Sequence, residues 1–151
     1  MTDSSSEFGG HEEFKVTPER LYALLTDFDA LAGAIPDLVS AEKIDERNLK
    51  CVVRPGFSFL RGTMKLHLVV EDLDPPCSAT MSVSAQGIGV AMRVLSHLVI
   101  RPASAGSTLD WSATISERKG LIAAVSPGLI KAAADQVIRH SWDAVRRQLG
   151  E

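Results

Sequence analysis

The feature that most constrains the fold is a period of two in the apolar residues, which runs from residue 37 to residue 118. Short alternating runs are separated by turn-forming stretches such as DERN, DLDPP, QGIGV and PASAGS. Successive side chains of a strand point to opposite faces, so the pattern is typical of strands with one buried and one solvated face. We therefore expect a long antiparallel meander.

Helical signals flank this meander on both sides. Thr17 as N-cap and Pro18 at the first helical position open TPERLYALLTDFDALAGAI, which predicts two short helices after a first strand in EFGGHEEFKV, with a bulge or bend at Gly9 and Gly10. A long helix follows Ser126 and Pro127 and ends before Gly150. Its apolar stripe contains Ile130, Ala133, Ala134, Val137, Ile138, Trp142, Val145 and Leu149. The chain should thus have an α+β fold in which a curved sheet wraps around the last helix.

Length and charge narrow the class of protein. The 151 residues suit one domain, which we place at 7–151 after a disordered N-terminus at 1–6. Sixteen Lys and Arg against 19 Asp and Glu give a net charge of -3, which argues against nonspecific binding to nucleic acid. The sequence lacks a secretory signal and an apolar run of about 18 residues, so we expect a cytoplasmic protein.

The stretch CSATMSVSAQ, residues 77–86, predicts a cavity. Its inward positions hold mostly small residues: Cys77, Ala79, Met81, Val83 and Ala85. They should face the Ala-rich N-terminal half of the last helix and leave a gap. An empty gap costs on the order of 24 cal/mol per Å³, so we expect it to hold a ligand.

Reactive side chains give little sign of chemistry. Cys51 and Cys77 fall at predicted inward strand positions and are interpreted as small buried hydrophobes. The four histidines lie on different elements without metal-ligand spacing, so we expect no metal and no covalently bound cofactor. Among the inward strand positions, Ser96 is the only hydroxyl, and no carboxylate or imidazole accompanies it. General acid-base catalysis needs such a group, so a non-enzymatic role is favoured.

The candidate ligand-binding residues are apolar. Trp111 is either a core residue or a ligand contact, and the connector 118–128 could form a hinged lid over the cavity. The full set is Phe57, Phe59, Met64, Leu66, Leu68, Ala79, Met81, Val83, Met92, Val94, Trp111, Ile122, Val125, Leu129, Ile130, Ala133 and Val137.

Four stretches follow one another along the chain: LLTDFDALAGAIPDL (24–38), FLRGTMKLHLVVEDLDPP (59–76), GSTLDWSA (106–113) and the closing helix from Ser126. In this order they resemble the CoxG-like subunit family of carbon monoxide dehydrogenase, a branch of the START-like (SRPBCC) helix-grip superfamily. Asp37 departs from the family, which usually has Gly there, so we expect a different turn.

The resemblance implies a seven-stranded antiparallel sheet around a long C-terminal helix, with an apolar cavity between them. It also implies association with a molybdenum hydroxylase of the carbon monoxide dehydrogenase type, in assembly, membrane recruitment or electron delivery. Some members carry a longer C-terminal tail that reaches the membrane. This sequence stops at Glu151, so we expect that function to be absent or the tail to be missing from it.

Our first hypothesis is a carrier of an apolar small molecule, a quinone or other isoprenoid lipid, that makes transient contact with the inner face of the membrane. The apolar tail of the quinone would lie along Met64, Leu66, Met81, Met92 and Val94. Its ring would lie near Trp111 or at the mouth of the cavity formed by 122–129. Two alternatives stay open. A cyclase- or dehydratase-like enzyme would need inward acids or histidines, and an assembly partner without a ligand would have a solid core.

Overall fold

One antiparallel sheet of seven strands forms the body of the protein, in the order β1-β7-β6-β5-β4-β3-β2. The computed structural model describes residues 6–35, 37–54, 62–87, 89–120 and 126–151. The strands are β1 (Ser6–Phe14), β2 (Leu38–Asp45), β3 (Asn48–Val53), β4 (Met64–Asp74), β5 (Ser78–Gly87), β6 (Val90–Ala103) and β7 (Gly106–Gly120). Strands β2 to β7 pair in chain order, and β1 joins them beside β7. The expected meander is therefore confirmed.

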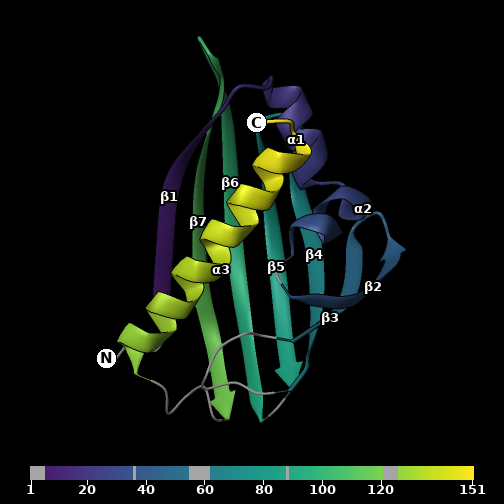
Figure 1. Ribbon diagram of the computed structural model, residues 1–151, viewed down its shortest axis with the longest axis vertical. Coiled ribbons are helices and arrows are strands. Elements are labelled where there is room, and N and C mark those ends of the chain that lie inside the picture. The colour runs from purple at the N-terminus through teal and green to yellow at the C-terminus, as the bar shows by residue number, and fades with distance from the viewer. Residues whose placement is uncertain (1–5, 36, 55–61, 88, 121–125) are drawn as a thin grey trace.

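Three short helical segments connect β1 to β2: α1 (Pro18–Leu25), α2 (Phe28–Leu31) and the 3-10 turn η1 (Ala32–Ala34). The Thr17 hydroxyl accepts a hydrogen bond from the backbone N–H of Arg20, which confirms Thr17 as the cap of α1. The Asp27 side chain caps α2 in the same way by accepting from the backbone N–H of Asp29. Figure 1 shows α1 near one end of the strands, close to the C-terminus of the chain, and α1 contacts the interior strands β6 and β7.

The long helix α3 (Pro127–Gln148) crosses the concave face of the sheet (Figure 1). The side chain of its N-cap, Ser126, accepts from the backbone N–H of Leu129, as expected. Gly150, with φ of 81°, follows the C-cap Leu149 and supplies the left-handed residue that commonly ends a helix. The predicted α+β helix-grip fold, a seven-stranded sheet wrapped around a long C-terminal helix, is confirmed.

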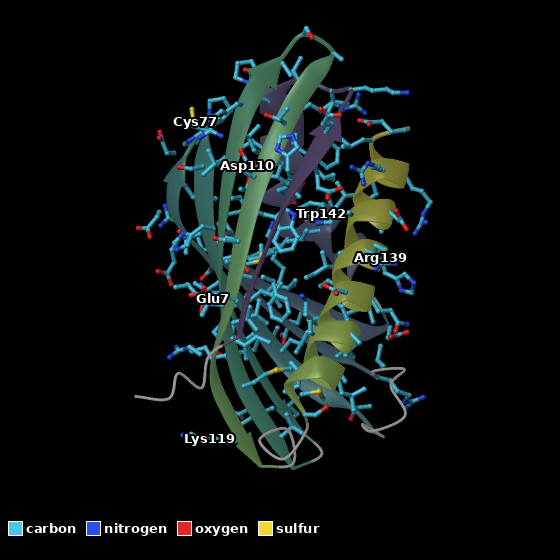
Figure 2. All side chains as sticks on the ribbon, turned by 90° about the vertical axis from the view of Figure 1, so that its left-hand side faces the viewer. Glu7, Cys77, Asp110, Lys119, Arg139 and Trp142 are labelled. Atoms are coloured by element: carbon cyan, nitrogen blue, oxygen red, sulfur yellow. The ribbon has the colours of Figure 1, made fainter. Side chains whose placement is uncertain are left out.

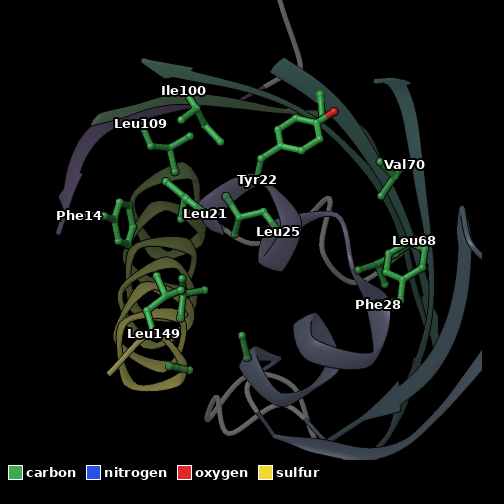
Figure 3. Close-up of a cluster of buried hydrophobic side chains, with 14 of the residues drawn as sticks. Phe14, Leu21, Tyr22, Leu25, Phe28, Leu68, Val70, Ile100, Leu109 and Leu149 are labelled. Carbon is green, nitrogen blue, oxygen red and sulfur yellow. The ribbon is translucent and has the colours of Figure 1, made fainter. Parts of the chain in front are cut away.

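Two hydrophobic clusters lie between the sheet and the helices. In the first cluster, α1, α2 and the C-terminal end of α3 pack on the sheet (Figure 3). Its buried members include Phe14, Leu21, Tyr22, Leu25, Phe28, Leu49, Cys51, Leu68, Val70, Ala79, Ile100, Leu109, Ala144, Val145 and Leu149. The second cluster is smaller, and among its described members Ile130 is the one that comes from α3. Its other buried members are Val53, Met64, Ala85, Val90 and Ile115.

The structure corrects two local expectations. The register of β1 with β7 is continuous through Gly9 and Gly10, so of the predicted bulge or bend the bulge is wrong. A Cβ atom on Gly10 would lie 2.8 Å from the Trp111 ring, and the absence of a side chain there makes room for the indole. Cys77 is exposed because β5 begins one residue later, at Ser78, whereas Cys51 is buried as expected.

Two further expectations concern the backbone at Asp37 and the N-terminal residues. Asp37, which replaces the family's usual Gly, has φ of 59°, the left-handed backbone conformation that glycine favours. Of the N-terminal segment expected to be disordered, residues 1–5 lie outside the described residues, and Ser6 begins β1.

Candidate functional site

A cavity of about 300 Å³ lies between the sheet and the helices, and we call it the inner cavity. The sheet contributes Leu66, Leu68, Met81, Val83, Ser96, Leu98, Trp111, Ser112 and Ala113. The helix α3 contributes Val137, Ile138, Ser141, Trp142 and Val145, and the segment from α1 to η1 adds Leu25, Leu31, Ala34 and Ile35. The volume lies at the lower end of the range of small-molecule sites, which is about 300–1,000 Å³.

Small side chains on the middle strands make room for the inner cavity. Met81 on β5 pairs with Ser96 on β6, and Ser96 pairs with Ala113 on β7. Because paired residues of adjacent strands share one face, these three side chains form a row across the floor of the cavity. The side chains of Ser96 and Ala113 are short, so they leave space between the sheet and α3 at this point.

Two rows of side chains on α3 form the opposite wall. Val137, Ser141 and Val145 are spaced four residues apart, and so are Ile138 and Trp142. Residues four apart lie on one side of a helix, so each row presents a continuous edge. The Ser141 hydroxyl donates to the backbone oxygen of Val137 at 2.8 Å, which satisfies that polar group within the helix.

The chemistry of the lining is almost wholly apolar. Among the described lining residues, none carries a carboxylate, an imidazole or a cationic group. The polar atoms are those of three serines and the indole N–H groups of Trp111 and Trp142. Both indole nitrogens are buried, and no group in the described part of the chain accepts a hydrogen bond from them. Such a lining can hold an apolar molecule.

The structure brings six of the predicted site residues together and separates the others. Leu66, Leu68, Met81, Val83, Trp111 and Val137 line the inner cavity. Met64 and Ile130 are buried in the second cluster, with Met92 and Val94 packed against it, and Ala79 lies in the first cluster. Leu129 is 43% exposed, and Ala133 is half-buried outside the lining. Phe57, Phe59, Ile122 and Val125 lie outside the described residues, and so does the part of the proposed lid at 121–125.

The cavity lies along a different part of α3 from the part expected. The Ala-rich N-terminal half was expected to face the gap, but the lining begins at Val137 and continues to Val145. Lining residues that were absent from the predicted site include Leu31, Ile35, Leu98, Ala113, Ile138 and Trp142. The apolar stripe already contained Ile138 and Trp142, but a stripe alone does not distinguish a packed segment from one that faces a cavity.

A second hollow, the outer groove, lies between β1 and α3 and has a volume of about 410 Å³. Its charged residues are Glu7 and Glu12 on β1 and Lys131, Asp135, Arg139, Asp143 and Arg146 on α3. Glu7 and Arg139 mark its two sides in Figure 2. Arg146 donates to Glu12 at 2.8 Å, which ties α3 to β1. The outer groove and the inner cavity share three residues, Trp111, Ile138 and Trp142.

Asp110 joins His11 and Arg101 on the outer face of the sheet. It lies 2.8 Å from His11 Nδ1 and accepts from Arg101 at 2.6 Å. The hydrogen bond with Asp110 raises the pKa of His11, and the same bond lowers the pKa of Asp110. These side chains are about half exposed and point away from the inner cavity, as a surface ion-pair network does.

Neither a metal cluster nor a membrane-spanning helix occurs among the described residues. Within those ranges, no three His, Cys, Asp or Glu side chains are grouped closely enough to hold a metal ion. The absence of a metal site therefore stays a prediction for the whole chain. None of the helices in the same ranges is both long enough and apolar enough to cross a membrane.

Comparison with known proteins gives both a family and a fold. The family model for the CoxG subunit of carbon monoxide dehydrogenase matches residues 10–150. A conserved protein from Geobacillus kaustophilus has a similar crystal structure, with a TM-score of 0.88 and 21% identity over 96% of this chain and 95% of that one. A START superfamily protein from Mycobacterium smegmatis has a TM-score of 0.67 and 14% identity, with 95% of each chain covered. A sequence search of curated proteins found no match.

Proposed function

Because the chain belongs to the CoxG subunit family of carbon monoxide dehydrogenase, we propose that it is a non-catalytic carrier of an apolar small molecule. The ligand is a quinone or other isoprenoid lipid, held in the inner cavity and not covalently attached. The partner is a molybdenum hydroxylase of the carbon monoxide dehydrogenase type. The carrier would serve that enzyme by delivering electrons, by recruiting it to the membrane or by assisting its assembly.

The observation that carries this proposal is the apolar lining of the inner cavity. At about 25 cal/mol per Å², burying roughly 400 Å² of apolar ligand surface contributes about 10 kcal/mol before the costs of association. That sum leaves room for micromolar binding, which permits both loading and release. Since the cavity is small, it would hold the ring and the start of a long tail, and the rest of the tail would extend beyond it.

The same lining weakens the two alternatives. A cyclase- or dehydratase-like enzyme would need a titratable group within hydrogen-bond reach of its substrate. The described lining residues include none. An assembly partner without a ligand would have a solid core, but the middle of this fold is hollow. The match to the CoxG family supports the proposed partnership with a molybdenum hydroxylase. Transient contact with the inner face of the membrane would allow the carrier to take up its ligand.

The test is the transfer of quinone from vesicles to the protein. Protein and quinone-containing vesicles are mixed and separated, and the soluble fraction is assayed for quinone. We expect about one quinone per protein and a loss of uptake in Ala113→Leu, which fills the floor of the cavity. The matched control, Ala133→Leu, changes a residue outside the lining and should leave uptake intact.

Two outcomes would contradict the proposal to different degrees. If the protein takes up a fatty acid or a sterol but no quinone, the quinone assignment fails and the carrier remains. If it takes up no apolar compound at all, the carrier function itself is wrong.

A further inference from the structure

The two edges of the sheet differ in how well they are protected against pairing with another chain (Figure 1). The edge strand β2 has register shifts near both of its ends, and such irregularities keep an edge from pairing. The other edge strand, β1, pairs with β7 without a shift over all nine of its residues. It contains neither proline nor lysine, two residues that commonly protect an edge. The β1 edge is therefore the regular one.

The C-terminal part of the β1 edge is covered by the end of the chain. The Glu13 backbone oxygen accepts from the Arg146 guanidinium at 3.3 Å, and the Lys15 N–H donates to Glu151 Oε2 at 3.0 Å. Since β7 lies on the other side of the strand, both bonds leave β1 on its free side. From Glu13 onward this side is thus occupied.

The N-terminal part of the same edge is exposed. The backbone groups of successive residues in a strand point to alternate sides, so Glu7, Gly9 and His11 direct theirs to the same side as Glu13 does. These three residues are exposed, and no strand in the described part of the chain pairs with β1 there. Figure 2 looks onto this edge, where β1 runs beside α3. A strand from outside can therefore reach these backbone groups.

The sequence of β1 is complementary to itself in one antiparallel register. When two copies pair about a twofold axis at Gly9, Glu7 of each copy lies opposite His11 of the other, which gives two pairs of opposite charge. The backbone groups also match, because all three residues direct theirs to the free side. An axis at Gly10 would instead place Glu7 opposite Glu13, and like charges in that position repel. Charge complementarity thus selects a second copy of this chain, centred on Gly9.

The surroundings of His11 favour this register. His11 Nδ1 lies 2.8 Å from Asp110, and this hydrogen bond raises the pKa of His11 and so favours its charged form. Asp110 also accepts from Arg101. With His11 protonated, two positive charges and one negative charge give this group a net charge of +1. The Glu7 carboxylate of a second copy would therefore be attracted to it.

The outer groove offers space for the inward residues of a second β1. In the register centred on Gly9, Phe8 of one copy lies opposite Gly10 of the other, where the Trp111 ring takes the place of a side chain. An aromatic ring opposite a glycine on an edge strand covers the exposed backbone. The apolar lining of the outer groove consists of Phe8, Trp111, Ile138 and Trp142. A second copy would bury part of this apolar surface.

We propose that two copies of this chain associate through β1, in an antiparallel register centred on Gly9 that joins their sheets into one. Because outward residues pair with outward residues, the twofold axis is perpendicular to the sheet and both α3 helices lie on the same face. The outer groove, which shares Trp111 and Trp142 with the inner cavity, would then be covered by the second copy. This interface goes beyond the proposed carrier function and does not depend on it.

The test is an exchange of charges, followed by sedimentation velocity over a series of protein concentrations at pH 6, where His11 is charged. Glu7→Lys and His11→Glu each place like charges opposite one another twice, so each variant should dimerise about tenfold more weakly than the parent. An equimolar mixture of the two variants restores opposite charges in both pairs and should form a heterodimer. The matched control Glu71→Lys changes an exposed residue of β4 and should dimerise like the parent.

Hydrogen exchange locates the contact without any substitution. Raising the concentration of the parent protein should slow exchange of the Glu7, Gly9 and His11 amides, which face the free edge. The Phe8 and Gly10 amides point toward β7, so their exchange should change much less. NMR spectra of the ¹⁵N-labelled protein report these amides one by one.

Three outcomes would overturn the proposal. A parent protein that stays monomeric at every concentration would leave the β1 edge for an extended segment of another protein. Dimerisation that neither charge variant weakens would place the contact on another surface. Concentration-dependent protection along β2 in place of β1 would assign the interface to the opposite edge of the sheet.

Discussion

The two ends of α3 are packed very differently. At the C-terminal end, Ala144, Val145 and Leu149 are between 2% and 9% exposed and lie in the first cluster with α1 and the sheet. Of the described side chains at the N-terminal end, only Ile130 is buried, and Leu129 is 43% exposed. The inner cavity lies between these two ends. The C-terminal end of α3 is therefore packed more tightly into the core than its N-terminal end.

This contrast indicates how a small domain can hold a cavity and remain folded. Burial of apolar area at the C-terminal end stabilises the domain, so the middle does not have to be filled. The N-terminal end, where Leu129 is exposed, buries less apolar area and should contribute less to stability. Three pairs of substitutions would test this division, each pair placing the same chemical change in both regions.

The largest effect is expected from the two leucines at the ends of α3. Leu149→Ala should lower the free energy of unfolding by about 2–4 kcal/mol, because it leaves a void in the first cluster. Leu129→Ala removes an exposed side chain and should cost about 0.5 kcal/mol or less. Urea unfolding of both variants measures the difference. If the two variants lose similar amounts of unfolding free energy, the two ends of the helix contribute equally to stability.

The second pair enlarges alanines in the sheet. Ala79 is 4% exposed within the first cluster, so Ala79→Leu should destabilise the fold by about 1–3 kcal/mol through overpacking. Ala113 lines the inner cavity, so Ala113→Leu should leave stability unchanged or raise it by about 1 kcal/mol. Thermal melting of the two ligand-free proteins compares them. A loss of stability in Ala113→Leu as large as in Ala79→Leu would argue that no usable space exists there.

The smallest effect concerns the glycines at the two ends of α3. Gly150 has φ of 81°, which strains any other residue, so Gly150→Ala should cost about 1 kcal/mol. A Cβ on Gly128 would meet nothing within 4 Å, so Gly128→Ala should stabilise the protein by about 0.4–1 kcal/mol through the unfolded state. Opposite shifts in melting temperature are expected, and shifts of the same sign would contradict the comparison.

The fold could be predicted largely from periodicity and capping. The alternation along 37–118 indicated which side chains face inward, and Thr17, Ser126 and Gly150 marked the helix ends that the structure has. The errors came from positions where alternation and composition mislead. Gly10 suggested a bulge, but it accommodates the neighbouring indole in a regular ladder. The alternating pattern of the sequence includes Cys77, which lies one residue before the strand begins and is exposed.

The site was harder to predict because inward-facing does not mean cavity-lining. Ala79 and Met81 are both inward on β5, yet Ala79 is covered by the first cluster and Met81 borders the inner cavity. Which of them is covered depends on where α1, η1 and α3 cross the sheet, and that arrangement is set by long-range packing. The small pair Ser96 and Ala113, adjacent across β6 and β7, was the local signal that could have located the hollow.

The pairing of β1 with β7 has a consequence for the order of folding. Residues 6 and 115 are register partners, whereas every other pair of neighbouring strands is consecutive in the chain. Closing so long a loop costs more entropy than closing a hairpin, so we expect β4, β5 and β6 to gain protection from hydrogen exchange before β1 does. Pulse labelling during refolding would detect this order, and simultaneous protection of β1 would contradict it. The strand synthesised first would then be the last to join the sheet, and the wall of the cavity beside it would be completed only at that final step.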